Sequence, residues 1–439
     1  MKKYDSYKNS GIEWYGNIPK HWSITRLKFL GDAIGGVTYS PKDIVEDPSK
    51  GVLVLRSSNI QNGKLDLSDT VYINQSISKK LTLRDGDILI CSRNGSRRLI
   101  GKNICIDERT SGHTFGAFMM IFRSTYFKWL SQYFNSPIFK SQSGLFLTST
   151  INQLTSGTLN NFEIALPPSI EEQTQIANYL DKKTTEIDSL IENKEKLITL
   201  LKEERTAVIN QAVTKGLDPN VPMKDSGIEW LGEIPEHWEV SRISFLTSRV
   251  GDGLHGTPKY VEESLYPFIN GSNIDDGEII ITERTKFVSQ EEYSKNKKVL
   301  TSNTILMSIN GTIGNLAFYN GETIMLGKSA AYINLEPNVN KEFVYYFLKS
   351  SAASDYINKE LSGSTIKNLS LNSIDKTPIP YPKEKEQKLI VSKIKNETLR
   401  IDEILLKSEQ EIELLKEYKT ALISEVVTGK VDVRNKKLD

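Results

Sequence analysis

The chain has 439 residues and a net charge of +1, with 38% hydrophobic and 25% charged residues. This length is about three times that of a typical single domain, so we expect two to four domains. No apolar run approaches the roughly 18 residues of a membrane span, and polar residues stand where a secretory signal would be apolar. These features exclude a transmembrane protein and predict a globular, cytoplasmic one.

Cysteine and histidine are too few and too scattered for a metal framework. Cys91 and Cys105 are the only cysteines, and the four histidines are far apart in the sequence. Two thiols in a chain without a secretory signal are expected to be reduced. No zinc-type spacing of Cys or His is present, so we predict neither a metal nor a cofactor in this chain.

Charge is unevenly distributed along the chain. The net charge is +8 for residues 1–165, −3 for 166–218, −5 for 219–378 and +1 for 379–439. A basic first segment favours a polyanionic partner such as nucleic acid, whereas the acidic third segment argues against a protein that holds DNA everywhere by bulk charge.

An internal repeat dominates the sequence. Residues 10–30, SGIEWYGNIPKHWSITRLKFL, recur at 226–246 as SGIEWLGEIPEHWEVSRISFL, with 13 of 21 positions identical. The period is far too long for a solenoid, so the chain is interpreted as two copies of one unit with an internal pseudo-two-fold. His21 and His237 lie within the repeat, where we expect hydrogen-bonded, packed side chains rather than catalytic ones.

A second repeated element predicts one long helix in each copy, at 169–215 and 383–429. The first has a Ser169 N-cap with a glutamate three residues on, and Gly216 at its end. At 1.5 Å per residue, a helix of about 45 residues is about 60 Å long. Such a helix exceeds what a small domain can cover, so we predict that the two helices pair with each other as an antiparallel coiled coil. The expected pairing residues follow a heptad: Leu180, Ile187, Leu190, Leu197, Leu201, Ile394, Ile401, Ile404, Leu415 and Leu422.

The segments between the repeated motifs are less alike but share a skeleton. Alternating or β-branched runs at 51–55, 71–73, 87–91, 118–122, 278–281 and 304–307 predict strands, and 127–134 and 341–348 predict helices. The expected fold class is therefore α+β, with two tandem pseudo-symmetric α/β domains, each followed by a long helix. The predicted boundaries are 1–165 and 219–379 for the two domains, 166–218 for the first helix, and 380–439 for the second helix and tail.

Catalytic motifs are represented only by near misses. Gly327-Lys328-Ser329 resembles the end of a Walker A loop, but the glycine that the motif requires is replaced by Glu322. A nuclease-like pattern of Asp375, Glu386 and Lys388 is expected by accident in a helix rich in Lys and Glu. No methyl-donor loop is present, so we predict no catalytic residue.

The densest cationic cluster is Arg93-Asn94-Gly95-Ser96-Arg97-Arg98. Arginine pairs bidentately with guanine or holds phosphate, and asparagine reads adenine, so this segment is a candidate DNA contact; the alternative is a solvated turn. The candidate DNA-binding residues of both copies are Ser57, Asn59, Arg93, Asn94, Arg97, Arg98, His255, Thr257, Lys259, Asn273, Asn310, Lys328 and Lys367.

The repeated Gly-Ile-Glu-Trp-x-Gly-x-Ile-Pro-x-His-Trp, a variable domain, and then Glu-Gln in a long heptad helix resemble the specificity subunit of type I restriction–modification systems. The resemblance covers nearly the whole chain, twice, in the same order. It implies two target recognition domains that each read half of a split double-stranded DNA sequence, with the helices fixing the spacer. It also implies a non-catalytic subunit that carries two modification subunits, which use S-adenosylmethionine to methylate adenine, and restriction subunits that need ATP and Mg.

Two other functional classes remain open at this point. One is a self-contained nuclease or methyltransferase, against which the absent nucleotide and methyl-donor loops count. The other is a helical scaffold whose α+β domains bind something other than DNA. The basic first domain is the feature that favours DNA binding over the scaffold.

Overall fold

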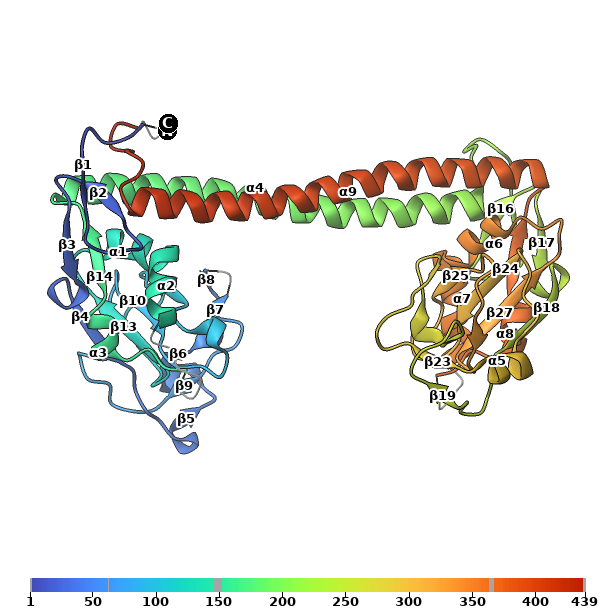
Figure 1. The fold of residues 1–439 in the computed structure, drawn as a ribbon, viewed down its shortest axis with the longest axis horizontal. Coiled ribbons are helices and arrows are strands. Elements are labelled where there is room, and N and C mark those ends of the chain that lie inside the picture. The colour runs from blue at the N-terminus through green and yellow to red at the C-terminus, as the bar shows by residue number, and fades with distance from the viewer. Residues whose placement is uncertain (1, 62, 146–151, 363–366, 437–439) are drawn as a thin grey trace. The chain divides into compact units, whose positions relative to one another are not determined.

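The computed structural model describes residues 2–61, 63–145, 152–362 and 367–436. The chain divides into two compact units: unit 1 contains residues 1–194 and 410–439, and unit 2 contains residues 195–409. Each unit holds one α+β domain and part of each of the two long helices (Figure 1). In the described part of the chain, no helix is long and apolar enough to cross a membrane.

The domain of unit 1 is built on two four-stranded sheets. One has the order β11-β10-β13-β4 and is antiparallel, and the other has the order β12-β6-β9-β5, with β12 parallel to β6. Its strands are Tyr7–Asn9 (β1), Asn17–Pro19 (β2), Ser23–Arg26 (β3), Asp32–Gly35 (β4), Ile44–Val45 (β5), Val52–Leu55 (β6), Ile60–Gln61 (β7), Lys64–Leu65 (β8), Tyr72–Ile73 (β9), Ile88–Cys91 (β10), Asn103–Cys105 (β11), Thr114–Phe115 (β12), Met119–Arg123 (β13) and Glu163–Leu166 (β14). Its helices are Phe127–Phe134 (α1), Pro137–Leu145 (α2) and Ser156–Asn160 (α3).

Strand β10 is buried on both faces, which places the core on either side of the first sheet. Ile88 and Ile90 pack into a cluster with Trp129 of α1, and Leu89 packs with Leu55 of the second sheet. Because successive side chains of a strand point to opposite faces, a continuous apolar run is what such a strand requires.

Unit 2 repeats this arrangement. Its sheets have the orders β18-β27-β24-β25 and β19-β23-β20-β26, again with one parallel pair, β20 and β26. Its strands are Met223–Asp225 (β15), Glu233–Pro235 (β16), Glu239–Arg242 (β17), Thr247–Asp252 (β18), Tyr260–Val261 (β19), Pro267–Ile269 (β20), Ile274–Asp275 (β21), Glu278–Ile279 (β22), Lys286–Val288 (β23), Thr304–Ser308 (β24), Leu316–Phe318 (β25), Met325–Leu326 (β26), Ala330–Leu335 (β27) and Pro378–Tyr381 (β28). Its helices are Gln290–Asn296 (α5), Lys341–Leu348 (α6), Ser351–Ser362 (α7) and Leu371–Lys376 (α8).

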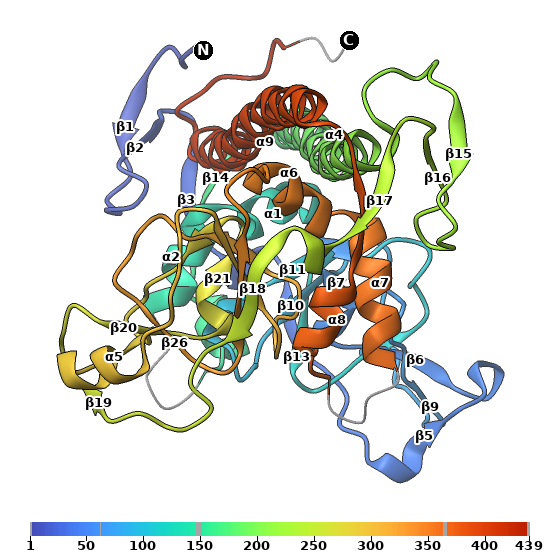
Figure 2. The ribbon, with the colours of Figure 1, turned by 90° about the vertical axis from the view of Figure 1, so that its right-hand side faces the viewer.

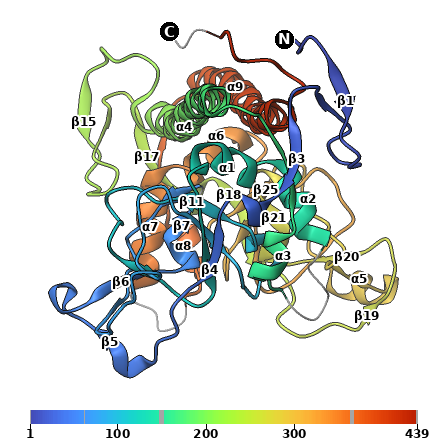
Figure 3. The same ribbon diagram turned by 90° about the vertical axis from the view of Figure 1, so that its left-hand side faces the viewer.

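The two long helices, Ile170–Lys215 (α4) and Glu384–Val427 (α9), run antiparallel in each unit. In unit 1, Lys419 Nζ lies 2.6 Å from Asp188 Oδ1, and Lys194 pairs with Glu411. In unit 2, Arg205 Nε lies 3.1 Å from Asp402 Oδ1. The helix ends lie side by side in the view of unit 2 (Figure 2) and in the view of unit 1 (Figure 3). The predicted antiparallel pairing is confirmed.

The apolar seam differs from the predicted one at two leucines. Leu190 and Leu197 are 50% and 40% exposed, while Ile191 and Ile198, one residue later, are partly buried. Adjacent helical residues point about 100° apart, so only one member of each Leu-Ile pair can face the partner helix. Of the other predicted pairing residues, Leu180, Ile187, Leu201, Ile394, Ile401 and Leu422 are buried, and Ile404 and Leu415 are partly buried.

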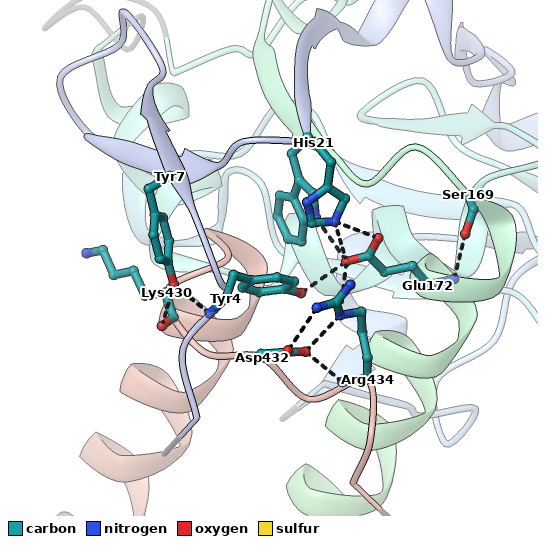
Figure 4. Close-up of polar contacts among 9 residues, drawn as sticks. Tyr4, Tyr7, His21, Ser169, Glu172, Lys430, Asp432 and Arg434 are labelled. Atoms are coloured by element: carbon teal, nitrogen blue, oxygen red, sulfur yellow. Dashed lines mark hydrogen bonds and ion pairs between the residues drawn. The ribbon is translucent and has the colours of Figure 1, made fainter.

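The repeated His-Trp motif attaches each domain to the start of a long helix. In unit 1, Glu172 accepts hydrogen bonds from Trp22 Nε1 at 3.1 Å and lies 3.1 Å from His21 Nε2 (Figure 4). In unit 2, Glu386 is bonded in the same way to Trp238 Nε1 at 3.0 Å and to His237 Nε2 at 2.9 Å. The histidines are therefore hydrogen-bonded as expected, although both imidazoles are partly exposed rather than buried in the core.

Residues near both ends of the chain contact the carboxylate of Glu172 in unit 1. Tyr4 Oη donates to Glu172 Oε1 at 3.2 Å, and Arg434 lies 4.0 Å from that oxygen while it pairs with Asp432 (Figure 4). The backbone N–H of Asp432 also donates to the carbonyl of Lys2 at 2.9 Å. These contacts fix the segment before β1 against the segment after α9.

Candidate nucleic-acid interface

Four loops of unit 1 converge at one end of its two sheets. We call this the first loop cluster: residues 36–41, 56–59, 92–98 and 116–118. Gly116 N donates to the carbonyl of Leu55 at 3.0 Å, and Arg93 N donates to the carbonyl of Phe118 at 3.0 Å. Asn94 Nδ2 donates to Ser57 Oγ at 3.3 Å. The loops are therefore held together by their backbones, and side chains such as Arg93 and Phe118 extend from a fixed base.

A groove of about 540 Å³ lies within the first loop cluster. Its wall is largely apolar, and its polar groups are the guanidinium of Arg56 and the hydroxyls of Thr38, Tyr39 and two serine residues. The lining residues are Val37, Thr38, Tyr39, Pro41, Ile44, Arg56, Ser57, Ser58, Gly116, Ala117, Phe118 and Met119. A hollow of this kind suits a flat, partly apolar group such as the edge of a base.

Arg93 and Phe118 form one exposed pair beside this groove. Phe118 is 58% exposed, and the guanidinium carbon of Arg93 lies 5.3 Å from the centre of its ring. Stacking on an aromatic ring limits the orientations of a guanidinium while leaving its N–H donors free for an acceptor in the plane. The pair is therefore preorganised for a planar acceptor such as the edge of guanine.

A second hollow, of about 430 Å³, gathers cations next to this loop cluster. Arg97, Arg98, Lys102 and Lys140 all line it. Arg97 Nη2 donates to the carbonyl of Gly144 at 2.9 Å, which fixes its direction, and Arg98 is exposed. Four cations around one hollow are suited to phosphate oxygens rather than to base edges.

Two predicted DNA contacts are corrected by the structure. Asn59 is 1% exposed, and its amide accepts from Arg56 N and donates to the carbonyls of Asp66 and Asp69. Asn273 is 8% exposed and bonded in the same way to Asn270 N and the carbonyl of Ile280. A buried amide with its hydrogen bonds satisfied holds its own turn, so neither residue stays a candidate for DNA contact.

Unit 2 brings the equivalent loops together, and we call residues 253–259, 270–273, 308–312 and 327–329 the second loop cluster. Gly271 N donates to Ser329 Oγ at 2.9 Å, and Thr312 Oγ1 donates to the carbonyl of Gly271 at 3.1 Å. The backbone of Gly271 lies so close to Ser308 that a Cβ at Gly271 would be 2.2 Å from Ser308 Oγ. The backbone plan matches that of unit 1, while the side chains differ.

The other predicted residues of unit 2 are exposed around these loops. His255 is exposed and lies 2.8 Å from Asp252 Oδ2, and Leu254 and Gly327 form a bridge that sets His255 near Lys328. Asn310 bridges with Asn368, next to Lys367. Thr257 and Lys259 are also exposed, further along the first of the four loops.

Three residues in the first loop cluster were missed by the sequence analysis: Tyr39, Arg56 and Phe118. Phe118 stands at the head of the apolar run 118–122, which predicts a strand, yet the strand begins at Met119. Its exposure comes from the turn 116–118. The exposure of a large aromatic residue at a strand end could not be told from an apolar run alone.

The near-miss catalytic patterns do not assemble in the described residues. Gly327-Lys328-Ser329 leads into strand β27, whereas a phosphate-binding loop leads into a helix. Glu386 holds His237 and Trp238, and Lys388 pairs with Glu384 at 2.6 Å. Burial raises the pKa of the Cys105 thiol to about 12 and raises that of Cys91, so both thiols stay protonated near neutral pH. Among the residues described, no group of three metal-ligating side chains occurs.

Comparison with known proteins identifies the arrangement. Residues 19–200 and 235–414 match the type I restriction modification DNA specificity domain. A putative type I restriction enzyme MjaX specificity subunit of Methanocaldococcus jannaschii is 27% identical, with 98% of each chain covered. The EcoKI specificity subunit of Escherichia coli K12 is 24% identical, with 86% of this chain and 82% of that protein covered.

Solved structures show the same fold. A chain from a structure of complex assembly and conformational transition in a type I restriction–modification system superimposes with a TM-score of 0.74 at 16% identity, covering 94% of this chain and 99% of that one. The HsdS subunit of Thermoanaerobacter tengcongensis gives a TM-score of 0.57, also at 16% identity, over 94% of this chain and 98% of that one. With two matched domains that span most of its length, the chain belongs to the type I restriction modification DNA specificity domain family.

Proposed function

We propose that this chain is the non-catalytic subunit that recognises DNA in a type I restriction–modification complex. Each domain reads one half of a bipartite double-stranded target, and the paired helices set the unread spacer. The alternative is a helical scaffold whose domains bind something other than DNA.

The observation that carries the proposal is the contrast between the two loop clusters. The same four loops meet in each unit with equivalent backbone contacts, while their side chains differ. Arg93 in the first cluster corresponds to Asn310 in the second, and Phe118 corresponds to Ser329. A shared scaffold with changed side chains is what two readers of different sequences need, because base readout depends on donors, acceptors and apolar groups at the loop tips.

The two domains differ in how they hold DNA. The first domain has a net charge of +8 over residues 1–165 and a hollow lined by four cations, so it contributes phosphate contacts of its own. The second has a net charge of −5 over residues 219–378 and offers Lys328, Lys367 and Lys259 near its loops. We therefore expect partner subunits to supply much of the phosphate contact around the second half-site.

The partners follow from the family. Under this proposal, the chain binds two modification subunits, which use S-adenosylmethionine. It also binds restriction subunits, which use ATP and Mg. The chain itself contributes recognition and assembly. Its cationic and polar loops bind and orient DNA, and the chemistry belongs to the partners.

The test is selection of binding sites from a random DNA library by the purified complex of this chain with its modification subunit. A motif of two short blocks with a constant gap is expected. Arg93→Ala should relax one base pair in one block only, with a loss of about 1–3 kcal/mol of discrimination there. Arg109→Ala is the matched control, since Arg109 is exposed but paired with Asp107 outside the loop cluster.

A single contiguous motif, or Arg93→Ala relaxing both blocks, would contradict the assignment of one domain to each half-site. Loss of sequence preference altogether, with an assembled complex, would favour the scaffold.

A further inference from the structure

Most residues that are identical in the two copies have a structural reason to be so. Trp22 and His21 bind Glu172, and their counterparts bind Glu386. Gly11 and Gly16, with their counterparts, have a positive φ in turns where a Cβ would be strained. Within the repeated segments 10–30 and 226–246, three exposed residues of each copy then remain: Glu13, Arg26 and Phe29, with Glu229, Arg242 and Phe245 as their counterparts. The phenylalanines are the large apolar side chains among them.

Both phenylalanines are highly exposed at equivalent places. Phe29 is 71% exposed and Phe245 is 76% exposed. Each follows the strand that precedes the first sheet of its domain, β3 in Figure 3 and β17 in Figure 2. Each ends a short 3₁₀ turn, Leu27–Phe29 or Ile243–Phe245.

The turns are rigid, so the exposure is not that of a loose loop. Leu27 is fully buried, and its N–H donates to the carbonyl of Phe162 at 3.0 Å. Ile243 is likewise fully buried, and its N–H donates to the carbonyl of Thr377 at 3.0 Å. Each turn is fixed to the core on one side and presents its phenylalanine to solvent on the other.

An arginine accompanies each phenylalanine three residues earlier. Arg26 is half exposed and only 3.9 Å from Glu163 Oε1, and Arg242 is exposed. Aromatic residues and arginine are enriched at protein–protein interfaces, where they fill and anchor pockets of the partner. We call each set, Arg26 with Phe29 and Arg242 with Phe245, an Arg–Phe pair.

We propose that the two Arg–Phe pairs are equivalent docking points for two copies of one protein partner, the modification subunit. This inference rests on the proposed function. Duplicated copies that differ in their loop clusters keep a residue in common only for something both copies do. Under the proposed function, the two copies differ in the DNA sequence that each reads. A phenylalanine ring carries no charge and no hydrogen-bond donor for a phosphate. A protein partner therefore fits the Arg–Phe pairs better than DNA does.

The experiment measures how many modification subunits the full chain carries, by native mass spectrometry of the co-expressed complex. The wild-type chain is expected to carry two. Phe29→Ala and Phe245→Ala should each bind one of the two at least tenfold more weakly, so that complexes with a single copy dominate at low concentration. The double variant should lose both copies.

Phe118→Ala is the matched control, because Phe118 is 58% exposed but belongs to a loop cluster and has Ser329 in place of a phenylalanine in the other copy. It should keep two copies. Thermal unfolding of the single variants should match that of the wild type, since each removed side chain is exposed.

Two results would overturn the inference, and they are distinguishable. If the wild-type chain carries no modification subunit, the proposed function fails as well. If it carries two and both phenylalanine variants still carry two with unchanged affinity, only the docking assignment fails. Weaker DNA binding by these variants at an unchanged stoichiometry would assign the pairs to DNA instead.

Discussion

Glu172 joins three separate parts of unit 1: the His-Trp motif, the first residues of the chain and the tail after α9. Its carboxylate is 8% exposed, whereas the equivalent Glu386 is 28% exposed and binds only the His-Trp motif among the contacts described. A buried donor that loses its acceptor costs about 1–3 kcal/mol, and Glu172 serves two such donors, Trp22 and Tyr4.

We therefore expect Glu172→Ala to lower the free energy of unfolding of unit 1 by about 2–4 kcal/mol. Glu386→Ala should cost unit 2 less. Denaturant unfolding measures both, with Glu171→Ala as the control, since Glu171 is exposed one residue away. Equal losses of unfolding free energy for Glu171→Ala and Glu172→Ala would contradict this expectation. They would show that negative charge at the start of the helix, rather than the hydrogen bonds of Glu172, is responsible.

His113 makes the stability of unit 1 depend on pH. Its Nδ1 accepts a hydrogen bond from Leu53 N at 3.3 Å, and desolvation lowers the pKa of the imidazole from its usual 6.5. The folded state thus binds fewer protons than the unfolded state just below pH 6.5, so stability falls as the pH is lowered through that range.

The unfolding midpoint of the wild type should therefore drop between pH 7 and pH 5. His113→Asn keeps an acceptor for Leu53 without titrating, and its midpoint should vary less over the same interval. Thermal unfolding at several pH values checks this. Identical pH profiles for the two proteins would exclude His113 as the source.

At the residue scale, the sequence indicates which side chains have the chemistry for DNA contact better than it indicates which of them are exposed. Arg93 and Arg98 are exposed near the loop cluster, as a cationic segment between strands predicts. Residue type predicts Asn59 and Asn273 as DNA contacts, yet both amides are bonded within their own turns. Burial of a polar side chain depends on neighbours far along the chain, such as Asp69 for Asn59, which a local pattern does not contain.

At the scale of elements, the periodicity of apolar residues is sufficient to predict where individual helices begin and end. Helices α1 and α6 begin and end where the patterns at 127–134 and 341–348 predict, and α4 and α9 lie within a few residues of the predicted helices. The short strands β7, β8 and β21 are not predicted, because two residues give no period, whereas β22 lies within the predicted strand at 278–281. The choice between Leu190 and Ile191 as seam residues also needed the partner helix.

The position of the seam gives an element-scale prediction. Ile187 is 5% exposed within the core of unit 1, and Leu190 is 50% exposed on the same helix. Ile187→Ala should cost about 2–4 kcal/mol of unfolding free energy, because it leaves a cavity, while Leu190→Ala should change it by less than about 0.5 kcal/mol. Denaturant unfolding compares the two variants. A larger loss of unfolding free energy for Leu190→Ala would instead support Leu190 as a pairing residue, as the heptad in the sequence predicts.

At the scale of the whole molecule, the chain is a duplication of one unit, and under the proposed function this duplication lets one chain recognise an asymmetric target. The two units carry two copies of one α+β scaffold, and each long helix begins in one unit and ends in the other. The repeat was visible in the sequence because the His-Trp motif and its glutamate must stay the same for each domain to be attached to its helix. The loop clusters diverged because they carry no such constraint.

Under the proposed function, the helices determine the spacer. Inserting seven residues after Leu197 in α4 and seven after Glu409 in α9 keeps the heptad phase and lengthens both helices by about 10 Å. The permitted gap between half-sites should lengthen by about 3 base pairs, or recognition should be lost, with both half-sites unchanged. Selection of binding sites from random DNA measures the gap. An unaltered target would refute the role of the helices as a ruler.

Genome-wide mapping of adenine methylation, in cells that express this chain with its modification subunit, tests the central claim most directly. The account predicts methylation at one bipartite motif with a constant unread gap, one block for each domain. Methylation at a single contiguous motif, or random methylation by a complex shown to be assembled, would contradict the claim that the two domains read two half-sites.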